Sequence, residues 1–90
     1  MSRAFLNEDA GSGGPIKRYL LPARDDPGFD SAAAEVLLEA AREGETASAE
    51  QATGYYWGEP KLRDHVRHIL VRAERVGDDR LEQLARRFLR

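Results

Sequence analysis

Residues 60–77 read PKLRDHVRHILVRAERVG, and this stretch predicts an amphipathic helix. Proline fits the first position of a helix, and glycine fits the position just after its end. Between them the apolar side chains recur at the spacing of one helical face: Leu62, Val66, Ile69, Leu70, Ala73 and Val76. The pattern therefore predicts one helix from Pro60 to Gly77 whose apolar stripe packs against other helices.

Two more helices are expected before this stretch. Residues 31–43 place alanine and leucine at helical spacing, and the Asp30 carboxylate is placed to cap the first turn. Residues 46–53 predict a short helix capped by Thr46 or Ser48, since a hydroxyl can accept a hydrogen bond from an unpaired backbone N–H group. Each segment is followed by a glycine, which favours the end of a helix.

A last helix is expected to begin at Asp78 or Asp79, directly after Gly77. No stretch alternates apolar and polar residues over the length of a strand pair, and no heptad repeat is long enough for a coiled coil. The sequence therefore predicts an all-α fold, a small bundle of three or four helices. The side chains expected on the buried face of the last helix are Leu81, Leu84, Ala85 and Phe88.

The helices are expected to form one domain over residues 29–90, with residues 1–28 as an extended, partly disordered tail. Residues 10–15 read AGSGGP, which is too rich in glycine to hold a helix. Residues 16–22 end in Pro22, which disfavours a helix. We expect this segment to dock on the domain, because a core of small side chains leaves apolar surface uncovered.

Composition limits what the chain can be. Of its 90 residues 41% are hydrophobic, but 13 are alanine, so the core is thin. The absence of cysteine excludes a disulfide framework, a zinc–thiolate site and a cysteine nucleophile. No apolar run approaches the length of a membrane span or a signal peptide, so we expect a soluble, cytoplasmic protein without membrane contact.

Charge is distributed unevenly around a net value of −2. Residues 31–60 carry a net charge of −5, whereas residues 61–90 carry +4. These two parts of the chain either neutralise each other inside the domain or present faces of opposite charge to partners. We expect internal pairing to dominate.

Three aromatic residues stand side by side at Tyr55, Tyr56 and Trp57. Adjacent side chains in a loop diverge, so the three rings cannot all enter one core. Trp57 is expected to fill the space between alanine-rich helices, which leaves a tyrosine at the surface. In the alternative interpretation the rings form a binding patch for a peptide or a nucleic-acid base.

The second candidate group is a set of arginines on the last two helices. Arg63, Arg67 and Arg75 are the candidate binding residues, because a guanidinium group binds phosphate and carboxylate equally well. The acids interspersed among them favour an acidic protein surface over nucleic acid. The remaining arginines of this region are Arg72, Arg80, Arg86, Arg87 and Arg90.

Signals for catalysis or a bound metal are weak. His65 and His68 share a helical face with Asp64 just before them, but no third strong ligand follows and the spacing is not that of a metalloprotease. The sequence contains no nucleophile elbow, no phosphate-binding loop and no dinucleotide fingerprint. We therefore expect no enzymatic activity, no metal site and no cofactor.

Residues 1–5 (MSRAF), followed by the acidic pair Glu8 and Asp9, resemble the N-terminal leader of some Gre-type transcription elongation factors. The resemblance covers residues 1–9 and implies a transcription-related setting. The coiled coil with an acidic tip and the polymerase-binding β-rich domain of those factors have no counterpart in residues 30–90. No functional residue is carried over from the family.

These patterns predict a small helical protein-interaction module that binds a protein partner or a second copy of itself. The alternative is a nucleic-acid-associated regulator that uses the arginines of the third and fourth helices. The two hypotheses differ in one structural respect. The arginines either converge on one exposed face or pair with glutamates from the acidic part of the chain.

Overall fold

The computed structural model describes residues 19–90, and this part of the chain contains helices and no strand. The all-α prediction is confirmed. The elements are α1 (Phe29–Arg42), α2 (Thr46–Thr53), the single 3₁₀ turn η1 (Pro60–Leu62), α3 (Arg63–Val76) and α4 (Asp79–Leu89). The expectations for residues 1–18, including the leader that resembles Gre-type factors, lie outside the described residues.

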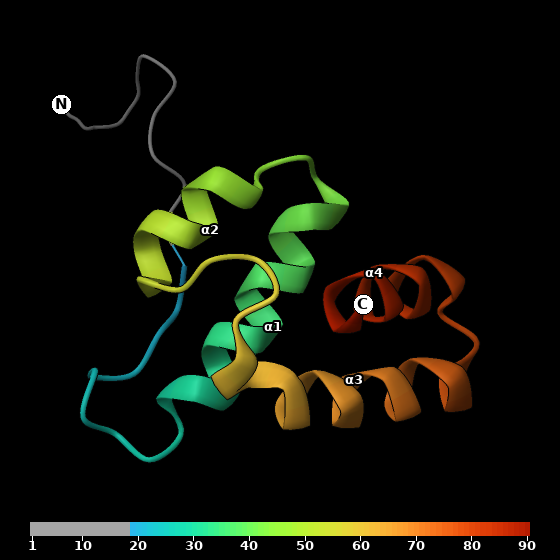
Figure 1. The fold of residues 1–90 in the computed structure, drawn as a ribbon, viewed down its shortest axis with the longest axis horizontal. Coiled ribbons are helices and arrows are strands. Elements are labelled where there is room, and N and C mark those ends of the chain that lie inside the picture. The colour runs from blue at the N-terminus through green and yellow to red at the C-terminus, as the bar shows by residue number, and fades with distance from the viewer. Residues whose placement is uncertain (1–18) are drawn as a thin grey trace, which may run out of the picture.

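Helix α1 lies at the centre of the arrangement (Figure 1). It contacts α2, η1, α3 and α4, whereas α2 contacts no helix other than α1 in the described part of the chain. Helices α3 and α4 run in opposite directions and pack side by side. The apolar core therefore lies between α1 and the α3–α4 pair.

The core combines a few large side chains with many alanines. Leu37, Leu38, Leu62, Val66 and Phe88 are its largest fully buried apolar side chains. Three alanines of α1 are buried as well, which allows the neighbouring helices to approach its backbone closely. The expected buried face of α4 is confirmed, since all four of its predicted members are buried.

Helix α1 begins at Phe29, two residues before the expected start. The expected cap is wrong, because Gly28 occupies the N-cap position and no side chain caps the helix. The Asp26 carboxylate instead accepts a hydrogen bond from the Gly28 N–H group at 2.7 Å. This turn fixes the entry to the helix, which leaves the Asp30 carboxylate free to bind elsewhere.

Helix α2 has the expected bounds, but neither hydroxyl caps it. Glu45 is its N-cap residue and makes no capping hydrogen bond with its side chain. Helix α4 begins at Asp79, one of its two expected starts, and the Asp78 carboxylate caps it by accepting a hydrogen bond from the Leu81 N–H group at 3.1 Å. The other oxygen of the same carboxylate accepts from Arg42 at 2.9 Å, so this cap also joins α4 to the end of α1.

Helix α3 ends as expected at Gly77, which has the left-handed φ of 76°. Its first residues differ from the expectation, since Pro60–Leu62 form a 3₁₀ turn before the α-helix begins at Arg63. The apolar stripe is also shorter than expected, because Val76 is 70% exposed. The last buried side chain of α3 is therefore Ala73.

The described chain begins with an extended segment that touches the core. Tyr19 and Leu21 are half-buried and pack against the core, whereas Leu20 between them is 97% exposed. No helix in the described part of the chain has the length and apolar character needed to cross a lipid bilayer.

Candidate functional site

The aromatic loop, residues 54–59, connects α2 to η1, and two glycines with left-handed backbones shape it. Gly54 has a φ of 79° and Gly58 a φ of 88°, a conformation that other residues rarely adopt. A Cβ atom at Gly54 would also lie 2.6 Å from a guanidinium nitrogen of Arg24. That guanidinium lies 5.3 Å from the centre of the Phe29 ring, as in a cation–π contact.

Helix α2 holds this loop through hydrogen bonds. The Thr53 hydroxyl oxygen accepts from the Tyr55 N–H group at 3.1 Å. The Glu50 carboxylate accepts from the Trp57 N–H group at 2.9 Å. These hydrogen bonds hold the backbone of the loop against α2.

The three rings point into three different surroundings, as expected for adjacent side chains. Tyr55 lies against α1, where its hydroxyl donates to Asp30 Oδ1 at 2.6 Å and its ring centre is 6.3 Å from that of Phe29. The hydrogen bond to Asp30, with a smaller effect from burial, raises the pKa of the Tyr55 hydroxyl. Tyr55 therefore anchors the loop to the fold.

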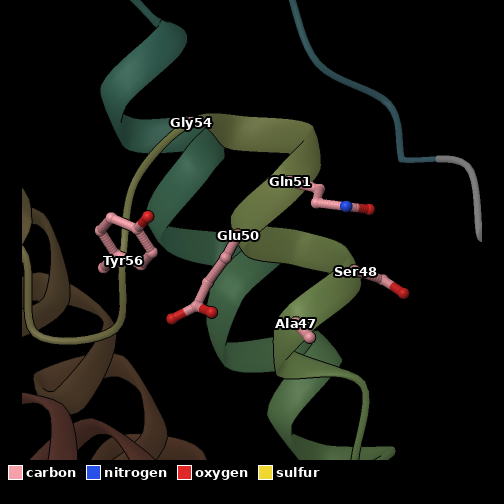
Figure 2. Close-up of a pocket in the computed structure, with 6 residues that line it drawn as sticks. All are labelled: Ala47, Ser48, Glu50, Gln51, Gly54 and Tyr56. Carbon is pink, nitrogen blue, oxygen red and sulfur yellow. The ribbon is translucent and has the colours of Figure 1, made fainter.

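Tyr56 is the ring left at the surface, with 76% of its area exposed. It borders a hollow of about 540 Å³ on the outside of α2. Figure 2 shows the Glu50 side chain directed toward the Tyr56 side of α2, and Ser48 and Gln51 directed away from it. Among the described residues that line this hollow, Glu50 alone carries a charge, and its carboxylate already accepts the hydrogen bond from the loop.

Trp57 is half-buried and does not fill the centre of the molecule. The expectation that Trp57 fills the space between the helices is wrong. Phe88 of α4 occupies the core instead and is only 1% exposed. The indole ring packs edge-on against Phe88, with ring centres 5.0 Å apart. Part of the indole therefore faces a second hollow.

This second hollow, here called the Trp57 hollow, has a volume of about 240 Å³. It lies where the end of α1, the start of α2, the aromatic loop and α4 meet. Its apolar wall comes from Trp57, Leu84 and Ala41, and two arginines stand at its rim. The residues that line it are Ala41, Thr46, Trp57, Arg80, Leu84 and Arg87.

Arg80 and Arg87 are exposed, and neither has a carboxylate partner among residues 19–90. They are seven residues apart on α4, so they share one face and lie about 10 Å apart along the helix axis. Leu84 lies between them on the same face. The hollow therefore has an apolar centre, and on either side of it stands a cation that has no carboxylate partner within residues 19–90.

The candidate arginines of α3 lie in other places. Arg63 donates to the Leu89 carbonyl oxygen at 2.9 Å, so it binds the open end of α4. Arg67 pairs with Asp64 at 2.6 Å along its own helix. Arg75 is exposed without a carboxylate partner in the described part of the chain. Two of the three candidates are therefore engaged within the protein.

Other arginines pair with acids, several of them across helices. Arg72 binds both carboxylate oxygens of Glu35 on α1, at 2.9 and 2.8 Å. Arg86 binds Glu74 at 2.6 Å and Glu82 at 2.9 Å. Each pair neutralises charge within the fold.

The histidines give no sign of a metal centre. His65 is half-buried and His68 is exposed on α3. Among residues 19–90 no group of three or more histidine, aspartate, glutamate or cysteine side chains could hold a metal ion.

The sequence pattern indicated Trp57 as a candidate residue. It did not indicate that Arg80 and Arg87 belong to the same site. The available signal was the i, i+7 spacing of Arg80 and Arg87 with Leu84 between them. That spacing places the three side chains on one face. It does not reveal that the aromatic loop packs against this face.

Comparisons of the chain with protein-family models, with curated proteins and with solved structures return no match. The resemblance of residues 1–9 to Gre-type factors, and the transcription-related setting that it implies, stay predictions. Function is therefore inferred from the side chains described above.

Proposed function

We propose that this chain is a small protein-interaction module. The four helices of residues 19–90 act as one bundle that presents the Trp57 hollow to a partner protein. The observation that carries the proposal is the half-exposed Trp57 ring beside two guanidinium groups that have no carboxylate partner among residues 19–90. Tryptophan and arginine are enriched among the residues that dominate the binding energy of protein interfaces.

The rigidity of the aromatic loop supports this role. Backbone N–H groups of the loop donate hydrogen bonds to Glu50 and Thr53, and Tyr55 is anchored to α1, so the loop is held in place before any partner binds. A surface that is already ordered loses less conformational entropy on binding, so more of the contact energy contributes to affinity.

The size of the hollow favours a side chain over a small-molecule substrate. Ligand sites for small molecules and cofactors commonly have volumes of about 300–1,000 Å³. The Trp57 hollow, at about 240 Å³, is smaller and open at its rim. Its dimensions suit one large side chain from another protein.

The nucleic-acid alternative receives less support. Two of the three candidate arginines on α3 are engaged within the protein, Arg63 by a carbonyl oxygen and Arg67 by Asp64. A phosphate backbone needs several cations on one face, because its affinity comes from counterions released at each neutralised phosphate.

The test compares the proteins captured from a native extract by the full-length chain and by two double variants. Arg80→Ala with Arg87→Ala removes both cations at the hollow, whereas Arg67→Ala with Arg75→Ala removes the same charge from α3. Quantitative mass spectrometry should identify a partner that the wild type and the α3 variant capture and the α4 variant loses. Trp57 is the only tryptophan, so addition of the purified partner should also shift its emission to shorter wavelength.

Equal capture by all three proteins, with all three folded by circular dichroism, contradicts the proposal. Loss of the partner from the α3 variant alone would instead place the binding surface on α3.

A further inference from the structure

We infer that the Trp57 hollow binds an acidic segment of a partner protein that inserts one large apolar side chain between its acids. This inference rests on the proposed function and specifies the chemistry of the partner.

The charge of the rim is the first argument. Arg80 and Arg87 stand on either side of the hollow without a carboxylate partner among residues 19–90. The nearby acid Glu82 is already bound by Arg86, at 2.9 Å. Asp79 precedes Arg80, but successive side chains of a helix point about 100° apart, so its carboxylate lies on another face. Glu45 directly precedes Thr46 of the lining, but it forms no ion pair with either arginine. Carboxylates of a partner would therefore complete the rim.

The apolar wall is the second argument. Trp57, Leu84 and Ala41 line a space that accepts a single large side chain. Covering the exposed part of the indole removes apolar surface from water, which favours binding. A ligand that carried only charged groups would leave this apolar wall exposed to water. The ligand therefore needs an apolar side chain as well.

The spacing of the two cations sets the pattern of the ligand. They are about 10 Å apart along α4, because seven residues of a helix rise by 1.5 Å each. An extended chain advances about 3.3 Å per residue and places every second side chain on the same face, so two acids four positions apart, about 13 Å and close to the spacing of the two arginines, share a face with the residue midway between them. The expected motif has an acid at each end and an apolar residue between them.

The surroundings of the hollow favour such a segment over nucleic acid. The hollow borders the start of α2, and residues 31–60 carry a net charge of −5. A duplex carries one negative charge per roughly 1.7 Å of its axis, so its phosphates would extend onto this acidic part. A short acidic segment can contact the two arginines alone.

The experiment titrates a labelled ten-residue peptide with a central leucine flanked by glutamates against the full-length chain at low ionic strength. Fluorescence anisotropy of the label and the emission of Trp57 report binding. Two matched peptides, one with serine in place of leucine and one with glutamine in place of glutamate, should each bind several-fold more weakly. Each lacks one of the two expected contacts.

Charge reversal on the protein provides the decisive comparison. Arg80→Glu with Arg87→Glu should weaken binding of the acidic peptide by about tenfold or more, since two attractive contacts become repulsive. The same variant should prefer a peptide with lysines in place of glutamates. Reversal at Arg67 and Arg75 should change the affinity less than about twofold, because these residues lie outside the hollow.

Two results would overturn the inference. One is a 20-base-pair duplex that binds as tightly as the acidic peptide and depends on the same two arginines. The other is a partner that requires Arg80 and Arg87 for capture while the acidic and glutamine peptides bind equally. Either result would still mean that the hollow is a binding surface. If the proposed function itself were wrong, substitution of Arg80 and Arg87 would leave the capture of partner proteins unchanged.

Discussion

Gly54 combines a left-handed backbone with the close approach of Arg24, and these two constraints can be separated by substitution. We expect Gly54→Ala to cost about 1–2 kcal/mol of unfolding free energy from backbone strain. Displacing the Arg24 guanidinium from Phe29 should add about 0.5 kcal/mol. Gly44→Ala is the matched control, because Gly44 has a φ of 73° and nothing within 4 Å of an added Cβ.

Urea unfolding of the two variants measures the difference. Equal losses for Gly54→Ala and Gly44→Ala would show that the contact of Arg24 with Phe29 contributes nothing to stability.

The hydroxyl of Tyr55 ties the loop to Asp30, and its removal should be visible in both stability and pH dependence. Tyr55→Phe loses one hydrogen bond to a carboxylate, which we expect to cost about 1 kcal/mol at neutral pH. The bond raises the pKa of Tyr55 above its ordinary value of 10.0. Its stabilising effect is therefore complete below pH 10 and is lost as the pH rises through the pKa of the folded state.

Unfolding measured at pH 7 and above pH 10 tests this expectation. The difference in unfolding free energy between the wild type and Tyr55→Phe should be smaller at the higher pH. Tyr56→Phe, at an exposed ring, should behave as the wild type at neutral pH, and a gap for Tyr55→Phe that is constant with pH would contradict the role of its hydroxyl.

At the scale of the elements, the Asp78 carboxylate joins two helices by capping α4 and pairing with Arg42 at the end of α1. These bonds hold the pKa of Asp78 below its ordinary value of 3.8, with the Arg42 contact as the largest cause. The stabilisation is present above the unfolded pKa and is lost as the pH falls through the folded one. Asp78→Ala should lower the melting temperature at pH 7 by about 5 °C.

Asp79→Ala is the control, since it removes an acid from the first turn of α4 without removing the cap. Thermal unfolding followed by circular dichroism should show a smaller shift for this control at pH 7. The decrease in melting temperature caused by Asp78→Ala should become smaller below about pH 4. A decrease that stays the same there would rule out the charged carboxylate as its source.

Local signals in the sequence were sufficient for most element boundaries. Glycine after residue 53 and after residue 76 marks the ends of α2 and α3, because it adopts the left-handed conformation there. The start of α1 was missed, because the Asp26 carboxylate stabilises a turn that lets the helix begin before Asp30. Whether Asp26 or Asp30 stabilises the start of the helix depends on backbone geometry, which the residue types alone do not specify.

The candidate site was less accessible from sequence than the fold. The divergence of three adjacent rings follows from loop geometry and was expected. Which ring enters the core was decided by α4, because Phe88 reaches the centre and leaves Trp57 at the edge. The Trp57 hollow exists only where α1, α2, the loop and α4 meet, so no single stretch of sequence contains it.

For the whole molecule, ion pairs join the acidic and the basic parts of the chain. Arg72 with Glu35 links α3 to α1, and Arg42 with Asp78 links α1 to α4. Exposed pairs of this kind contribute little to stability, because solvent screens them. Their larger effect is on the electric field, since each pair removes a cation that a phosphate backbone could have used.

We therefore expect no strong binding to nucleic acid. At physiological salt the affinity for a 20-base-pair duplex should be no better than about 10⁻⁴ M, the weak end of non-specific binding. Anisotropy measured across a salt series tests this. Micromolar affinity with a log–log slope of about −3 to −4, abolished by Arg67→Glu with Arg75→Glu, would favour the regulator hypothesis instead.

Because α2 packs on α1 and on no other helix of the described chain, it can separate from the rest without breaking the α3–α4 pair. Local opening of this kind is faster and less costly than global unfolding, and native-state hydrogen exchange detects it. The amides of α2 should exchange ahead of those in α1 and α4. Since Glu50 of α2 holds the backbone of Trp57, each opening would also release the aromatic loop. The lifetime of the closed α2 would then limit how long the Trp57 hollow persists.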